Sequence, residues 1–123
     1  MLREGVGFNK VILICGRTDL RKGASGLAAV IQYQYALNAL EEGTLFLFCG
    51  GNRGVVKGLL FEGDGYLLLV KRLSSGLFLW PRNTNEARQI DPDAFRRLMD
   101  GFQVDSSIRR IPWTEPLAQQ QDL

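Results

Sequence analysis

The chain has 123 residues, with 15 basic residues, 13 acidic residues and no histidine. This length is typical of one domain, and the lack of histidine excludes Ser-His and Cys-His nucleophile pairs and removes the commonest metal ligand. We therefore expect a non-enzymatic protein with no metal and no cofactor. No apolar run approaches the roughly 20 residues of a membrane-spanning helix, and the N-terminus lacks a signal-peptide core, so we expect a cytoplasmic protein.

The first predicted elements are a strand and a helix. Residues 8–15 form a β-branched, leucine-rich run that is typical of a strand and ends at Gly16. Apolar residues at broken helical spacing then predict a helix over residues 25–40. Asp19 or Ser25 is the candidate N-cap, and Gly43 is the candidate C-terminal stop.

Several runs rich in strand formers follow, separated by short turns that contain glycine. The four main runs are residues 44–49, 55–62, 66–73 and 77–80. Turns this short favour antiparallel hairpins, and Gly76 is expected in the left-handed conformation. Residues 86–90 are a candidate further strand.

A second helix is predicted over residues 92–100, with Asp91 as N-cap, Pro92 at the first helical position and Gly101 as the stop. The order β-α-β-β-β-β-α predicts an α+β fold with a mostly antiparallel sheet. We expect a single domain over residues 1–104 and a polar C-terminal tail over residues 105–123.

The two cysteines, Cys15 and Cys49, each end an apolar run and form no CxxC motif. Such a pair predicts two buried, reduced thiols rather than a disulfide framework or a metal site.

Two cation-bearing turns allow two interpretations each. In "TDLRKG", Arg21 and Lys22 follow Asp19 close to the predicted helix start, which is either an ordinary helix entry with solvated cations or an anion site. In "GGNRGVVK", Arg53 and Lys57 lie in or beside a glycine-rich turn, which is either a flexible hairpin loop or a close approach to a phosphate backbone.

Lys71 and Arg72 are adjacent late in an apolar strand, where neighbouring side chains point to opposite faces. If Glu62 pairs with Tyr66 across the Gly-Asp-Gly turn, Lys57 lies opposite Lys71. Like charges directly opposite each other are unfavourable unless an anion or a carboxylate separates them, so this register predicts a cationic spot on the sheet. The alternative is that the inward-facing cation reaches solvent past the edge of the sheet.

Four motifs occur in order along the chain: "TDLRKGASGLAAVI", "LFLFCG", "VVKGLLFEGDGYLLLVKRLSSGLFLWPRN" and "IDPDAFRRLMDG". In this order and spacing they closely resemble the TnpB-type accessory protein of the insertion-sequence sixty-six family of bacterial transposable elements. The resemblance covers roughly residues 8–104. It implies a small protein that works beside a separate, larger transposase, and it is the transposase that carries the catalytic acidic residues.

The resemblance selects the residues that we take as candidates for function. The family-motif positions without a proposed binding role are Thr18, Asp19, Gly23, Gly26, Asp64, Gly65, Trp80 and Pro81. The candidate nucleic-acid-binding residues are Arg21, Lys22, Arg53, Lys57, Lys71 and Arg72. The chain departs from the family before Lys57, where members usually carry an arginine-rich turn and this chain has only Arg53.

Composition and resemblance together predict a non-enzymatic accessory factor of DNA transposition. Its expected partner is the element-encoded transposase, with duplex DNA as the candidate second partner and with no membrane and no small-molecule substrate. The alternative is a protein-interaction subunit that binds the transposase without touching DNA.

Overall fold

The computed structural model describes residues 8–82 and 84–101. Its elements are β1 (Lys10–Ile14), α1 (Ala24–Ala29), the π-helix η1 (Val30–Gln34), β2 (Thr44–Cys49), β3 (Val55–Phe61), β4 (Tyr66–Arg72), β5 (Ala87–Ile90) and α2 (Pro92–Asp100). The predicted tail over residues 105–123 lies outside the described residues. Within those residues, no helix has the length and apolarity needed to cross a membrane.

The five strands form one sheet in the order β4-β3-β2-β1-β5. Three of the four pairings are antiparallel, and β1 pairs with β2 in parallel. A parallel pair needs a crossover connection, and α1 lies on that connection. The predicted α+β class with a mostly antiparallel sheet is confirmed, whereas the parallel β1–β2 pair was not predicted.

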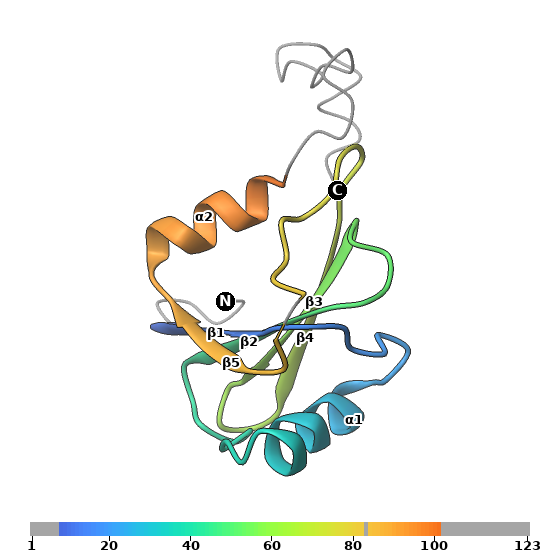
Figure 1. Ribbon diagram of the computed structural model, residues 1–123. Coiled ribbons are helices and arrows are strands. Elements are labelled where there is room, and N and C mark those ends of the chain that lie inside the picture. Colours follow the sequence, from blue (N-terminus) through green and yellow to red (C-terminus); the bar gives the residue numbers. More distant parts are fainter. Residues whose placement is uncertain (1–7, 83, 102–123) are drawn as a thin grey trace.

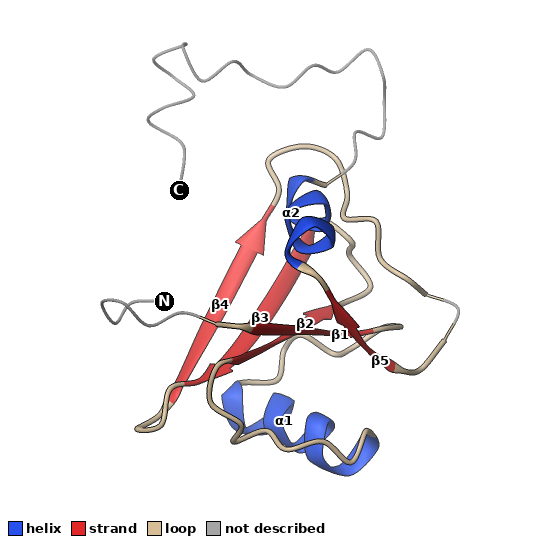
Figure 2. Ribbon diagram, turned by 90° about the vertical axis from the view of Figure 1, so that its left-hand side faces the viewer, coloured by secondary structure: helices blue, strands red, loops and turns tan. Residues whose placement is uncertain are grey.

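The two helices cover opposite faces of the sheet, with α1 on one face and α2 on the other (Figures 1 and 2). Alternate strand residues therefore enter two different cores. The α1-side core contains Ile14, Leu27, Ile31, Phe46, Phe48 and Leu59. The α2-side core contains Leu13, Leu47, Val56, Phe78 and Trp80, with Phe95 of α2 packed against it.

The first helix is shorter than the predicted range of 25–40. Its α-helical part has six residues, Gly23 takes the N-cap position in place of Asp19 or Ser25, and no side chain caps it. The apolar positions Ile31 and Leu37 are six residues apart, which places them about 120° apart around an α-helix of 3.6 residues per turn. The chain instead leaves the helix, and Leu37 packs against the α1-side core.

The second helix has the predicted bounds. Asp91 is the N-cap, and its side-chain Oδ1 accepts a hydrogen bond of 2.7 Å from the backbone N–H of Ala94. Gly101 follows the helix with a φ of 77°, a conformation that favours glycine. Both cysteines are also buried free thiols, as predicted.

The predicted strand over residues 77–80 is wrong, and so is the hairpin that it was expected to form with β4. Phe78 and Trp80 are buried in the α2-side core, so their alternation reflects burial rather than strand pairing. The Phe78 N–H donates a 2.8 Å hydrogen bond to the carbonyl of Arg53, and the Trp80 indole N–H donates a 3.1 Å bond to the carbonyl of Ile14. As a result, β4 lies at the edge of the sheet, and the strand after it is β5.

The predicted register between β3 and β4 is wrong by one residue. Phe61, not Glu62, lies opposite Tyr66, because the turn contains four residues and is closed by a 2.8 Å bond from the Glu62 N–H to the Gly65 carbonyl. Lys57 therefore lies opposite Val70. A shift of one residue moves a side chain to the other face of a sheet, so Lys57 and Lys71 are on opposite faces.

Candidate nucleic-acid interface

An open groove of about 850 Å³ lies where the β1–α1 connection meets the ends of β3 and β4. Four cations line it: Arg17, Arg21, Lys57 and Arg72. Among the residues that the structure describes, Asp19 is its one acidic lining residue. We call this hollow, defined by the four cations, the basic groove.

The sheet positions two of these cations. Arg72 lies opposite Val55, and Lys57 lies opposite Val70, so all four residues are on one face of the β3–β4 pair. That face is the α1 side, because Leu59 of the same strand belongs to the α1-side core. Arg72 is exposed, and Lys57 is partly buried.

The β1–α1 connection brings the other two cations. The N–H of Thr18 donates a 2.9 Å hydrogen bond to the carbonyl of Cys49, which fixes this connection against the end of β2. Asp19 accepts bonds of 3.0 Å from the backbone N–H and from the guanidinium of Arg21. These bonds, and above all the one from the Arg21 side chain, lower the pKa of Asp19 to about 2. The Asp19 carboxylate is therefore ionised at neutral pH and already paired with Arg21.

The glycine-rich turn after β2 permits a close approach of Arg17. A Cβ added to Gly51 would lie 3.0 Å from Nη2 of Arg17, so the guanidinium lies directly against the turn. A Cβ at Gly50 would likewise lie 3.0 Å from Cγ of Leu20. The glycines of this turn thus have a packing role beside the basic groove.

The structure brings only some of the predicted binding residues together. Arg21, Lys57 and Arg72 line the basic groove, and Lys22 lines a neighbouring hollow. Arg53 lies in the turn before β3, outside the lining of both hollows. Lys71 lies on the α2 side of the sheet, where its Nζ donates a 2.7 Å hydrogen bond to the carbonyl of Met99.

Some family-motif residues hold the backbone. Trp80 is buried and bonds the carbonyl of Ile14, and the carbonyl of Pro81 accepts a 2.7 Å hydrogen bond from the N–H of Gly16. Gly23 is the N-cap of α1.

Other motif residues are explained by the local backbone. A Cβ at Gly26 would lie 2.9 Å from Cβ of Lys22, so only glycine fits there without a shift. Asp64 and Gly65 belong to the turn that precedes β4, at the opposite end of this strand from Arg72.

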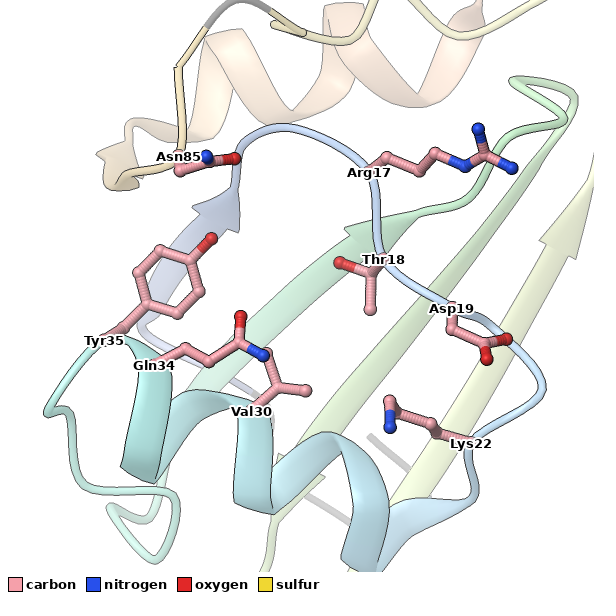
Figure 3. A pocket seen from close by; sticks show the side chains of 8 residues that line it. All are labelled: Arg17, Thr18, Asp19, Lys22, Val30, Gln34, Tyr35 and Asn85. Carbon is pink, nitrogen blue, oxygen red and sulfur yellow. The ribbon is translucent and has the colours of Figure 1, made fainter.

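The neighbouring hollow is a pocket of about 360 Å³ (Figure 3). It shares Arg17, Thr18 and Asp19 with the basic groove, and its remaining lining residues are Lys22, Val30, Gln34, Tyr35 and Asn85. We call it the polar pocket. Burial raises the pKa of the Tyr35 hydroxyl, with a smaller contribution from Cys15.

The residues selected from the sequence do not include Arg17, Gln34, Tyr35 and Asn85, which line these hollows. Arg17 precedes "TDLRKG" directly in the sequence, outside the motif itself. Gln34, Tyr35 and Asn85 carry no local signal in the sequence. Only the tertiary contact between the end of the first helix and the segment before β5 assembles them.

Comparison with known proteins gives one family. The family model described as "IS66 Orf2 like protein" matches residues 9–109. A protein of Sinorhizobium fredii, "Uncharacterized protein y4hO", is 36% identical over 93 residues, which are 76% of this chain and 80% of that protein. A second protein of the same organism, "Uncharacterized protein y4jC", is 24% identical over 107 residues, covering 87% of this chain and 90% of its own. No solved structure gives a significant match.

Proposed function

The chain belongs to the family of IS66 Orf2-like proteins, and from this premise we propose that it is a non-enzymatic accessory factor of DNA transposition that contacts duplex DNA through the basic groove. In this proposal it acts beside a separate transposase encoded by the same element. The family membership supports the accessory role, and the groove supports the contact with DNA.

The observation that carries the proposal is the convergence of four cations on one groove. They come from two distant parts of the chain, the β1–α1 connection and the β3–β4 pair. The paired Asp19 compensates the charge of one of them, Arg21. The groove thus retains a net positive charge, which is the electrostatic feature that attracts a phosphate backbone.

The chemistry of the groove favours phosphate contacts over base recognition. Long cationic side chains on an open surface neutralise phosphates and position a duplex, but they carry little sequence information. We therefore expect affinity that depends strongly on salt and only weakly on sequence. Selection of the element's own ends is then left to the transposase.

A second candidate function is a protein-interaction subunit that binds the transposase without touching DNA. The observation that favours it is Val70, an apolar side chain that is 56% exposed and lies in the lining of the basic groove. An exposed apolar group gains more from a protein partner than from a phosphate backbone. Under this alternative, the cations serve acidic groups on the transposase.

A salt titration separates the two functions. Fluorescence anisotropy would measure the binding of wild-type protein, Lys57→Ala and Arg72→Ala to a duplex from the element's ends and to a random duplex of equal length. Each lost phosphate contact lowers the slope of log affinity against log salt concentration by about 0.9. We expect both substitutions to weaken binding to both duplexes alike.

Lys71→Ala is the matched control, because Lys71 adjoins Arg72 in the chain but lies on the other face of the sheet. It should leave the salt slope unchanged. Absence of binding to either duplex at low salt, together with capture of purified transposase that Arg72→Ala abolishes, would reject DNA contact and support the protein-interaction function.

A further inference from the structure

The polar pocket lies beside the basic groove and shares one wall with it. Arg17, Thr18 and Asp19 line both hollows, so a strand whose phosphates lie in the groove passes directly along the mouth of the pocket. The volume of about 360 Å³ falls within the range of about 300–1,000 Å³ that is usual for small-molecule sites.

Two backbone irregularities form the side of the pocket opposite the shared wall. Residues Val30–Gln34 are a π-helix, and Ala36 has a φ of 55° in the left-handed region. Both conformations are rare for ordinary residues, and they are concentrated at functional sites. Here they flank Gln34 and Tyr35, which are two of the lining residues.

A third irregularity, at Gly16, lies beside Asn85. Gly16 has a φ of 82°, and a Cβ on it would lie 2.8 Å from the side-chain Oδ1 of Asn85. Figure 3 shows the Asn85 side chain and the Tyr35 hydroxyl at the same end of the pocket. A larger residue in place of Gly16 would be strained by its backbone conformation and would displace the Asn85 side chain.

The lining groups match the parts of a nucleotide. The amides of Gln34 and Asn85 each carry donors and an acceptor, which is the combination that pairs with base edges. Tyr35 provides an aromatic ring for stacking and a hydroxyl that can both donate and accept a hydrogen bond. Arg17 and Lys22 lie on the side toward the groove, where they are suited to a phosphate.

We propose that the polar pocket receives one unpaired nucleotide of the DNA strand that lies in the basic groove. This inference rests on the proposed function, because the groove supplies the phosphate path that leads to the pocket. Taking a base out of the stack costs least where that base is already unpaired. The protein should therefore prefer DNA with an unpaired base over fully paired DNA of the same sequence.

The test uses two duplexes of equal length, one fully paired and one with a single unpaired 2-aminopurine. We expect the second duplex to bind on the order of tenfold more tightly, as stacking on one aromatic side chain provides, and its fluorescence to change on binding. Gln34→Ala and Tyr35→Ala should abolish this preference and leave the affinity for the paired duplex unchanged. Tyr33→Ala is the matched control, since Tyr33 belongs to the same helix but is 82% exposed.

Tyr35→Phe is the second variant at this position, for the case that Tyr35→Ala does not fold. It keeps the aromatic ring and removes only the hydroxyl. Equal affinity for the two duplexes would overturn the pocket inference while the proposed function stands. Failure to bind either duplex would overturn both. A third titration, with free deoxyadenosine monophosphate, distinguishes a free nucleotide from a nucleotide that is part of a DNA strand. If the free nucleotide binds tightly and the protein shows no preference between the two duplexes, the proposal that the pocket receives a nucleotide of DNA is overturned.

Discussion

The Nζ of Lys71 lies 2.7 Å from the carbonyl oxygen of Met99 and donates a hydrogen bond to it. Met99 is in the last turn of α2, where carbonyls lack a partner within the helix and a nearby cation also interacts favourably with the helix dipole. Lys71 therefore ties the C-terminal end of α2 to the edge strand β4. Arg72, its neighbour in the chain, lines the basic groove on the opposite face. Two adjacent cations thus have separate tasks.

The first prediction tests the different roles of Lys71 and Arg72. Lys71→Ala should lower the free energy of unfolding by about 0.3–1 kcal/mol, the usual contribution of a cation at an exposed helix C-terminus. Arg72→Ala should change it by less than about 0.5 kcal/mol, as surface substitutions usually do. Urea unfolding measures both, and amide hydrogen exchange should show faster opening of α2 in Lys71→Ala alone. Equal protection of α2 in the two variants would contradict the contact with Met99.

The second prediction concerns the pH dependence of the β1–α1 connection. The pKa of the Asp19 carboxyl is lowered from 3.8 to about 2, chiefly by the hydrogen bond from the Arg21 side chain. Because the folded-state pKa is below the unfolded value, its stabilising contribution is fully present above pH 3.8 and is lost as the pH falls through about 2. Carbon NMR of the carboxyl should give the low midpoint.

Arg21→Ala should move the midpoint of Asp19 back toward 3.8. Arg96→Ala is the control, because Arg96 pairs with Asp93 on α2 and belongs to a different part of the surface. A midpoint near 3.8 in the wild-type protein would show that the Asp19–Arg21 pair is not formed in solution.

The third prediction concerns the thiols. Cys15 is 1% exposed and Cys49 is 0% exposed, and burial raises the pKa of Cys49 more than the nearby Arg82 guanidinium lowers it. Because the thiolate is the reactive form, both thiols should react slowly with a disulfide reagent at pH 7 in the native state and rapidly after unfolding. Fast labelling of either thiol under native conditions would disprove this.

The parts of the fold that the sequence predicts are those with local signals. The helix over residues 92–100 has the Asp91 cap at its start and Gly101 at its end, and both signals act within a few residues. The β3–β4 hairpin is likewise indicated by its Gly-Asp-Gly turn. The sequence does not indicate the register of this hairpin, because a turn of three residues and a turn of four residues both fit the same glycines. The choice between them decides whether Lys57 lies opposite Lys71 or opposite Val70.

The parts that sequence reasoning missed depend on contacts between distant segments. The alternation of Phe78 and Trp80 is that of a strand, but their partners are the α2-side core and the carbonyls of Arg53 and Ile14. The parallel pairing of β1 with β2 depends on where the first helix packs, which its broken apolar pattern does not reveal.

The candidate site likewise combines residues that the sequence identifies with residues that only the tertiary structure reveals. Arg21, Lys57 and Arg72 are among the candidate binding residues named from the sequence, and these three residues line one groove. The sequence also indicated that Lys71 lies opposite Lys57, whereas the structure has these two residues on opposite faces of the sheet. The position of Arg17 depends on the hydrogen bond between Thr18 and Cys49, which joins segments about 30 residues apart and leaves no trace in the local pattern.

The last prediction concerns Thr44, at the start of β2. Its side chain is buried, with 1% of the residue exposed, and its Oγ1 has no hydrogen-bond partner among the described residues. A buried polar group without a partner costs about 1–3 kcal/mol, and valine has nearly the same shape without the hydroxyl. Thr44→Val should therefore raise the free energy of unfolding by about 1 kcal/mol or more, measured by urea denaturation at constant slope.

Two further variants make the result of Thr44→Val interpretable. Thr44→Ser keeps the hydroxyl and loses a methyl group, so it should lower the free energy of unfolding by about 0.8 kcal/mol, the value of one buried methylene. Thr84→Val changes an exposed threonine and should have an effect below about 0.5 kcal/mol. If Thr44→Val instead destabilises the protein while Thr84→Val does not, the hydroxyl of Thr44 forms a hydrogen bond in solution, and the start of β2 is held by a polar contact rather than by apolar packing alone.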